Sequence, residues 1–347
     1  MSRPFRGNAH RKMQEMNEWT KKRQEPALDP DLPIIDPHHH LWDGEERGGR
    51  YLMHELAEDT ATGGHNIVAT VFIDAGVMYR AEGPQEMKAV GEVEFVNGVA
   101  AMSASGKYGK TRHCAGIIGH VDMMLGDRAT PVLEAEIKAG NGRYRGIRHG
   151  AVWDTGEAAK FGRRHMPRHQ MLDPQFRKGF ACLHPLGLSF EAWVYHPQLG
   201  DVADLLKQFP DTNVVLNHVG GLLGIPPHEN RKATFEVWKK NILQLVPYKN
   251  MSVKLGGLGM VHCGWDFHFR DVPPSSDELA KEWRPYIETC IEAFGPERCM
   301  FESNFPVDKV SCTYADLWRS FELMVADAST GEREDLFAGT ATRAYRL

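Results

Sequence analysis

The sequence predicts an α/β fold, a (β/α)8 TIM barrel with an N-terminal arm and long βα lid loops. Eight short apolar runs alternate with longer amphipathic stretches along the 347 residues, and this alternation is typical of a parallel sheet covered by helices. Eight such units in one chain favour closure into a barrel. An open doubly wound sheet is the alternative, but it normally carries a Gly-rich phosphate turn after an early strand, and no GxGxxG motif stands there.

The predicted strands are short and apolar, and several are rich in β-branched residues, as in the run NIVATVFID at residues 66–74. They cover residues 32–36, 66–74, 115–122, 144–149, 188–195, 213–219, 251–255 and 299–304. The helix-like stretches between them include residues 84–105, 131–139, 173–182, 198–209, 232–245 and 276–294.

Two of the predicted connections are unusually long, residues 153–171 after the fourth strand and residues 256–275 after the seventh. Both are βα loops, which lie on the face of a barrel where active sites are built. Because both loops mix aromatic residues and histidines with polar ones, we expect lids rather than disordered segments. His262 and His268 in the second loop either close over a substrate or lie on the surface.

Residues 1–31 form a polar arm that precedes the barrel domain at residues 32–347. We expect a short helix over residues 12–24, then a linker bounded by prolines. The arm lacks the apolar core of a signal peptide, which favours packing over targeting. It packs either against the barrel bottom or against another subunit, and such an arm suits a homodimer.

The composition excludes several classes of function. A formal net charge of -5 gives no overall positive field for binding nucleic acid. The longest apolar runs are strand-sized, too short to cross a membrane. The six cysteines form no CxxC pair and follow no secretory signal, so we expect reduced thiols in a cytoplasmic enzyme that acts on a small molecule.

The most informative motif is Asp36-Pro37-His38-His39-His40, at the end of the first predicted strand. Side chains two residues apart share one face of a strand, so His38 and His40 project together into the barrel while His39 faces the helices. Two imidazoles at the C-terminal end of a barrel strand can hold one divalent cation. A lone histidine is more often a packed residue, whereas this spaced pair indicates a functional site.

The motif DPHHHLWD resembles the signature of the amidohydrolase superfamily, in the branch of the sugar-acid, sulfomuconolactone and pyrone-dicarboxylate lactonases. The resemblance continues through RGIRH, LNHVGG, VKLGGL, FESNFPVDK and the terminal GTATRAYRL. It implies a TIM-barrel hydrolase in which His218 is a metal ligand or a contact to the attacked carbonyl; a buried histidine bonded to backbone is the alternative. The branch includes metal-dependent and metal-independent lactonases, so the resemblance implies either one zinc or manganese ion or a metal-free site.

The eighth predicted strand departs from the family pattern. Relatives usually read GSDWP, with the Asp as general base, whereas this chain reads Glu302-Ser303-Asn304-Phe305-Pro306. The amide of Asn304 cannot accept a proton at neutral pH, although it can orient water or substrate. Glu302 shares strand parity with Asn304, so we hypothesise that the carboxylate has moved down one layer to Glu302. Asp308, beyond Pro306 on the loop, is the other candidate base.

Together with Glu302, the histidines of the first and sixth strands form a proposed set of metal ligands: His38, His40, His218 and Glu302. A buried glutamate is costly unless it is paired or bound to a metal. In the alternative interpretation, Glu302 pairs only with Lys254 or Arg148 inside the barrel.

Substrate binding is expected near the fourth strand. Arg148 is predicted to point inward with His149 beside it, and the next loop holds a basic cluster, Arg163, Arg164, His165, Arg168 and His169. Guanidinium groups bind carboxylates bidentately, so the cluster favours a carboxylate-bearing small molecule, unless it is only a solvated loop. Lys254 on the seventh strand is predicted to face the cavity, and Trp193 and Tyr195 on the fifth to form an apolar wall.

The function predicted from these residues is hydrolysis of a cyclic ester or related acyl compound that carries an anionic group. A cation or the histidine pair would polarise the carbonyl, and a carboxylate would activate water. Two alternatives stay open: a metal-dependent or metal-free decarboxylase or hydratase of aromatic or unsaturated acids on the same barrel, and a binding homologue that has lost catalysis.

Overall fold

Eight parallel strands form the centre of the molecule and follow one another in chain order, from β1 to β8. The computed structural model describes residues 11–161 and 166–347. The strands are β1 Pro33–His39, β2 Asn66–Ile73, β3 Arg112–Gly119, β4 Tyr144–Arg148, β5 Ser189–Ala192, β6 Val214–Leu216, β7 Met251–Leu255 and β8 Cys299–Phe301. Every neighbouring pair is parallel, which confirms the predicted (β/α)8 barrel.

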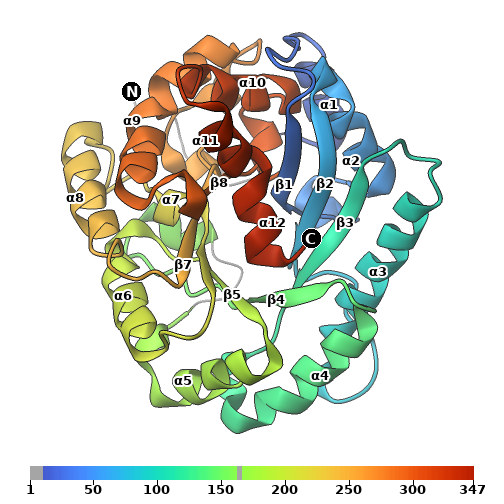
Figure 1. Cartoon of the computed structure of the whole chain (residues 1–347), viewed down its shortest axis with the longest axis vertical. Helices are drawn as coiled ribbons and strands as arrows, with labels where there is room; N and C mark the ends of the chain where they lie inside the picture. The colour runs from blue at the N-terminus through green and yellow to red at the C-terminus, as the bar shows by residue number, and fades with distance from the viewer. Residues whose placement is uncertain (1–10, 162–165) are drawn as a thin grey trace.

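Most of the helices surround this sheet on its outer side, whereas the C-terminal helix crosses one end of it (Figure 1). The helices are α1 Met13–Thr20, α2 Met53–Thr60, α3 Val90–Ala104, α4 Ala129–Ala139, α5 Pro174–Ala181, α6 Leu199–Gln208, α7 His218–Gly221, α8 Arg231–Leu243, α9 Ser276–Phe294, α10 Tyr314–Met324, α11 Thr330–Glu334 and α12 Thr340–Tyr345. Large apolar side chains such as Trp238, Trp283 and Trp318 are fully buried on their inner faces, and each stabilises the packing by about 1.5–3 kcal/mol or more. Among the described residues, no helix is both long and apolar enough to cross a membrane.

The predicted elements are all present, but several end earlier than the apolar pattern suggested. The sixth and eighth strands stop at Leu216 and Phe301. Residues with positive φ follow shortly after, His218 and Val219 beyond β6 and Asn304 beyond β8, and an extended ladder cannot continue through them. The helix expected from residue 84 begins at Val90, since a separate 3-10 turn occupies Gln85–Met87.

The barrel is closed between its first and last strands by backbone contacts beyond the end of β8. The amide of Asn304 donates to the carbonyl of His38 at 2.9 Å, and the amide of His40 donates to the carbonyl of Phe305 at 2.8 Å. His39 and Phe305 form a parallel bridge. The ends of the first and eighth strands are therefore adjacent, as the predicted site requires.

Side-chain hydrogen bonds to a buried carboxyl group strengthen this closure. Asp36 on β1 accepts hydrogen bonds from the amide and hydroxyl of Ser303, at 3.0 and 2.6 Å, and from the hydroxyl of Tyr314 at 3.0 Å. It also accepts from the amide of His38 at 3.2 Å. Burial raises the pKa of Asp36 to about 6, against the opposing effect of these four donors. Asp36 thus fixes the segments that carry His38 and Glu302.

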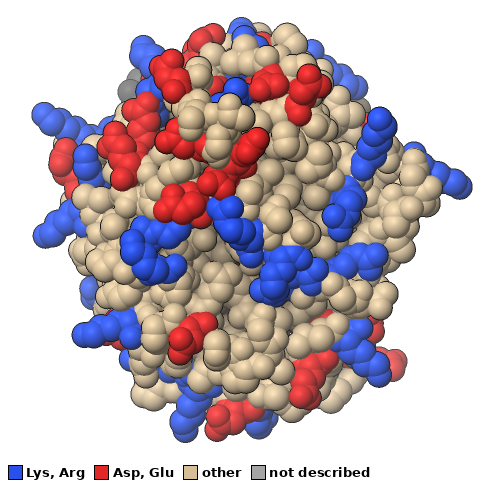
Figure 2. Space-filling model, in the orientation of Figure 1, with Lys and Arg blue, Asp and Glu red and all other residues tan. Residues whose placement is uncertain are grey.

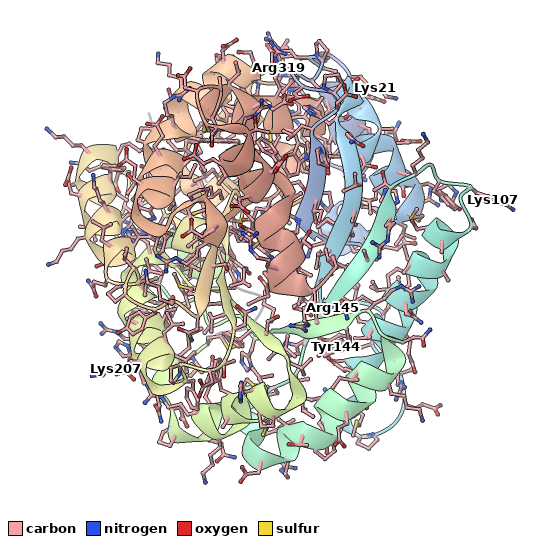
Figure 3. All side chains as sticks on the ribbon, in the orientation of Figure 1. Lys21, Lys107, Tyr144, Arg145, Lys207 and Arg319 are labelled. Atoms are coloured by element: carbon pink, nitrogen blue, oxygen red, sulfur yellow. The ribbon has the colours of Figure 1, made fainter. Side chains whose placement is uncertain are left out.

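The C-terminal helix covers one end of the barrel. α12 and the C-terminus lie across the strands in Figure 1, and the hydroxyl of Tyr345 donates to Glu191 on β5 inside the barrel. Tyr144 and Arg145, labelled in Figure 3, belong to the start of β4 near this end. Figure 2 shows charges of both signs spread over this face. The functional site must therefore open at the opposite end, where the strands finish.

The described part of the arm packs along the side of its own barrel, from the loop face towards the barrel bottom. The indole nitrogen of Trp19 in α1 donates to the carbonyl of Arg270, at 2.9 Å, in the long loop after β7. Further along, the amide of Leu28 donates to Glu322 of α10 at 2.9 Å. The arm therefore runs from the loop side of the barrel along α10 towards the start of β1. A homodimer stays a prediction.

We expect Asp36→Ala to lower the free energy of unfolding by about 3 kcal/mol, because four buried donors would lose their common acceptor. Chemical denaturation followed by tryptophan fluorescence measures this loss. Asp211→Ala, at an exposed position, is the matched control and should change stability by less than about 0.5 kcal/mol. Equal effects of the two substitutions would contradict the assigned role of Asp36.

Candidate active site

A cavity of about 340 Å³ opens at the C-terminal ends of the strands, the face on which TIM-barrel enzymes place their active sites. Both predicted lid loops contribute to it, through Phe161 and Met166 after β4 and through Met260 and His262 after β7, and Val152 just before the first loop also lines it. The other lining residues come from the strand ends and shorter loops: His40, Trp42, Asp74, Gly76, Tyr79, His120, Arg148, Gly150, Trp193, Tyr195, His218, Asn304 and Val307.

The floor of this cavity holds a cluster of histidines around one buried carboxyl group. Glu302 lies between two imidazoles, with Oε2 2.8 Å from Nδ1 of His38 and Oε1 2.7 Å from Nδ1 of His218. Nε2 of His38 lies 3.2 Å from Nε2 of His40. Glu302 and His38 are completely buried, whereas His40 and His218 line the cavity. The structure thus brings together the four residues that the sequence predicted as one set.

Strand geometry and two glycines explain how these side chains meet. His38 and His40 alternate with His39, which faces outward and contacts the hydroxyl of Thr70 at 2.8 Å. A Cβ at Gly257 would lie 2.3 Å from Nδ1 of His218. A Cβ at Gly256 would lie 2.5 Å from Cγ of Glu302. The glycines of the KLGGL run therefore leave room for both members of the contact.

The backbone at His218 also has an unusual conformation, which positions its side chain at the cluster. His218 and Val219 have φ values of 54° and 46°, and Gly220 and Gly221 continue in the left-handed region. Such backbone is costly for residues with a branched side chain and is concentrated at functional sites. The turn directs His218 back over the barrel axis instead of along the strand.

Hydrogen-bond partners assign the protons of this cluster. The carbonyl of Ile73 can only accept, so Nδ1 of His40, 2.8 Å away, carries a hydrogen and Nε2 is an acceptor. The amide of His218 donates to Oε1 of Glu302 at 3.2 Å. The Nδ1–H of His218 can donate to the same oxygen, which leaves Nε2 of His218 unprotonated.

Burial dominates the electrostatics of the cluster. It raises the pKa of Glu302 to about 8, against the lowering effect of the nearby ammonium of Lys254. Burial also lowers the pKa values of His38 and His218 well below the usual range, and Lys254 and Arg148 add to this effect. At neutral pH the cluster therefore consists of neutral imidazoles around a carboxyl group that is mostly protonated.

Two fixed cations flank this cluster. The ammonium of Lys254 lies 3.3 Å from Nδ1 of His38 and 2.9 Å from Glu191. A guanidinium nitrogen of Arg148 lies 3.3 Å from Nε2 of His38. Glu302 is therefore not merely the partner of Lys254 or Arg148, since Lys254 forms its ion pair with Glu191. Lys254 itself lies beneath the histidines and does not line the cavity.

Glu191 is a site residue that sequence reasoning missed. It is completely buried on β5 and also accepts hydrogen bonds from Asn217 and Tyr345. The available signal was a charged residue between Phe190 and Ala192 in an otherwise apolar strand, since a buried charge needs a partner. His120, Asp74 and Tyr79 also line the cavity and were not singled out by the sequence.

Asn304 lies at the cavity surface, whereas Asp308 lies buried behind it. Asn304 lines the cavity, and its amide nitrogen donates to Asp308 at 2.7 Å. Asp308 is completely buried behind it, accepts from the amide of Gly259 at 2.8 Å, and does not line the cavity. Burial raises the pKa of Asp308 well above its usual range. Asp308 therefore fixes Asn304 and has no direct access to a substrate.

Some of the predicted substrate-binding residues line the cavity and others do not. Arg148, Trp193 and Tyr195 line the cavity. His149 does not, because its ring is buried outside the cavity, where Nδ1 accepts from the amide of Met123 at 3.0 Å. Arg148 also donates to the carbonyl of Asp74.

The predicted basic cluster is only partly described. Arg163, Arg164 and His165 lie outside the described residues. Arg168 and His169 are exposed, with Arg168 stacked 5.0 Å from the ring of Trp153 and His169 3.0 Å from Asp201. These two side chains therefore contact neighbouring loops and do not line the cavity.

The donor atoms of the cluster fit a divalent cation. Ligand atoms of His38, His218 and Glu302 all lie within 4.8 Å of one another, and the lowered pKa values of both histidines keep their lone pairs available. Imidazole and carboxylate are the ligands that zinc takes in catalytic sites. His40, whose Nε2 faces His38, stands beside this group.

The family model described as amidohydrolase matches residues 35–347. An uncharacterised protein of Sinorhizobium fredii, y4mH, is 31% identical over 91% of this chain and 99% of its own. An L-fucono-1,5-lactonase of Burkholderia multivorans is 25% identical over 67% of this chain and 72% of its own. The crystal structure of an amidohydrolase from Burkholderia multivorans with bound zinc has the same fold, with a TM-score of 0.66 and 22% identity over 90% of this chain and 99% of that one.

These similarities define first a class, a TIM-barrel enzyme with a histidine-rich site at the ends of its strands. The chain belongs to the amidohydrolase family. Both the predicted resemblance and the prediction of a hydrolase are thereby confirmed.

Affinity for a divalent cation should rise with pH up to about 8. Glu302 is protonated below its raised pKa of about 8, and a ligand must lose its proton before it binds a metal. Calorimetric titration of chelator-treated protein with zinc, in buffers of different ionisation enthalpy, measures both the affinity and the protons released. We expect about one proton released per zinc at pH 7 and fewer at pH 9. The same titration of Glu302→Gln distinguishes binding at this site from adventitious binding. Zinc affinity that survives the substitution would contradict this ligand set.

Proposed function

We propose that this protein is a lactonase-like hydrolase that opens a cyclic ester, or a related acyl compound, on a small molecule bearing an anionic group. The observation that carries the proposal is the contact between His218 and Glu302. A cavity-lining imidazole has a buried carboxyl group 2.7 Å behind its inner nitrogen. A carboxyl group in this position orients an imidazole through a hydrogen bond, as in hydrolases that activate an oxygen nucleophile.

The proton taken from the attacking water goes to Nε2 of His218. That nitrogen is unprotonated in the tautomer whose Nδ1–H donates to Glu302. Asn304 lines the same cavity and is held by Asp308, so its amide orients the water rather than accepting the proton. This arrangement accounts for the absence of the family aspartate at position 304.

The attacked carbonyl lies near the cationic side of the floor in this proposal. Arg148 lines the cavity and provides fixed positive charge for the oxyanion that develops as water attacks. Buried Lys254 adds to the local positive potential from below, since it lies 3.3 Å from His38. An anionic group of the substrate is attracted to the same side, because a guanidinium binds carboxylates well.

A divalent cation would be held by His38, His218 and Glu302, with His40 beside them. Such an ion supplies Lewis-acid polarisation of a carbonyl and lowers the pKa of water. The relative crystallised with bound zinc supports zinc as the ion to test first. Manganese is the second ion to test.

Glu302→Gln should lower kcat/KM for a hydrolysed lactone at least about 100-fold, which is the usual loss when acid–base catalysis is disrupted, because Glu302 orients the imidazole that accepts the proton. The amide keeps the shape of the carboxyl group but cannot be ionised, so the melting temperature near pH 8 should not fall. Burial raises the pKa of Glu302, which means that ionisation opposes folding as pH rises from about 4.5 towards 8. Initial rates on aliphatic, aromatic and sugar-acid lactones, together with calorimetric melting, provide both readouts.

Glu288→Gln is the matched control, because Glu288 is partly exposed on α9, outside the cavity lining, and pairs with Arg284 within the described residues. It should leave kcat/KM within twofold of the wild type. A panel of carboxylated aromatic acids, analysed by product mass, tests decarboxylation with the same preparations. Turnover of lactones that survives Glu302→Gln would contradict the proposed role, and release of carbon dioxide without lactone turnover would replace the hydrolase with a decarboxylase.

A further inference from the structure

The cavity has two chemically different sides. Its floor is polar and carries His40, Arg148 and His218, whereas the wall above it is built largely from aromatic rings. In this wall, the ring centroid of His262 lies 5.2 Å from that of Phe161, 5.5 Å from that of Tyr195 and 6.1 Å from that of Trp193. Such a wall favours a flat, apolar group over a sugar ring with hydroxyl groups on every side.

His262 is the polar exception in this wall. It is 3% exposed, and neither ring nitrogen has a hydrogen-bond partner among the described residues. Its main chain is held in place, because the carbonyl of His262 accepts from the amide of Gly224 at 2.8 Å. A buried polar group without a partner is rare and destabilising, so its presence in a cavity wall calls for an explanation. One explanation is a ligand that supplies the missing hydrogen bond.

The protonation state of His262 restricts what that ligand offers. Burial lowers the pKa of His262 to about 3, and His218 adds to this effect. A neutral imidazole has one donor and one acceptor and carries no charge for a carboxylate. The partner is therefore a neutral polar group, and a hydroxyl can serve either nitrogen.

We infer that His262 forms a recognition subsite for a hydroxyl group on an aromatic ring, so that the substrate is a phenolic compound whose ester or anionic end faces Arg148 and His218. Trp193 connects the two ends of the cavity, since its ring contacts both His262 and His218, the latter at 4.8 Å between centroids. A ligand stacked on this indole reaches the floor with one end and His262 with the other. The inference rests on the proposed function for the reaction and adds the class of substrate.

Direct binding tests this subsite without turnover. The probes are 3-phenylpropionate and the three isomers of its ring-hydroxylated derivative, 3-(2-, 3- or 4-hydroxyphenyl)propionate. Each pairs a carboxylate for Arg148 with a ring for the aromatic wall. Calorimetric titration gives the Kd of each, and hexanoate and gluconate are the aliphatic and sugar-acid comparisons. We expect at least one hydroxylated isomer to bind about tenfold more tightly than 3-phenylpropionate, the effect of one well-formed hydrogen bond. Both comparison acids should bind more weakly than the aromatic ones.

His262→Phe is the decisive variant, because it keeps an aromatic ring in the wall and removes both nitrogens. The tenfold preference for the hydroxylated isomer should fall to about one. His184→Phe, on the exposed turn before β5, is the matched control and should leave the preference intact. A preference that survives His262→Phe, or gluconate binding as tightly as the aromatic acids, would overturn the inference.

The same measurements separate this inference from the proposed function. If the hydroxyl preference depends on His262 but no lactone is hydrolysed, the subsite stands and the proposed reaction is wrong. If aliphatic lactones are hydrolysed through Glu302 and no ligand shows a preference that depends on His262, the reaction stands and the subsite is wrong.

Discussion

The structure depends on one buried carboxyl group, that of Glu302, placed between two imidazoles at the centre of the barrel. A carboxyl group with no exposed surface is tolerated only if its charge is neutralised or paired. Here burial favours the protonated acid, and both oxygens face histidine nitrogens. The glycines at 256 and 257, the left-handed turn at His218 and the closure of β1 onto β8 all serve to bring these three side chains together.

The barrel supports this cluster with layers of fixed charge. Beneath it, Lys254 forms an ion pair with Glu191, and Tyr345 from the C-terminal helix donates to Glu191 from the far end. Beside it, Asp36 connects the strand of His38 to the segment of Glu302 through Ser303. Because these contacts are buried and mutually satisfied, they hold the imidazoles in place without the rearrangement that exposed residues would need.

Much of the arrangement was predictable from sequence, because strand parity carries directional information. The spacing of His38 and His40 predicted their shared face, and the parity of Glu302 and Asn304 placed both inside the barrel. Parity fails where the backbone leaves the extended region, so the early ends of β6 and β8 at positive φ could not be read from apolar runs. It also carries no information about partners, which is why Glu191 was missed, why His149 was assigned to the cavity and why Asp308 was not recognised as the support of Asn304.

The most direct test is the protonation state of Glu302 itself. Infrared difference spectra between the wild type and Glu302→Gln, recorded on chelator-treated protein across a pH series, isolate the carboxyl stretch of this one residue. We expect a protonated carboxylic acid band at neutral pH that disappears with a midpoint near 8. A carboxylate band already fully formed at pH 6 would show that Glu302 titrates as an ordinary glutamate, and would contradict the central claim.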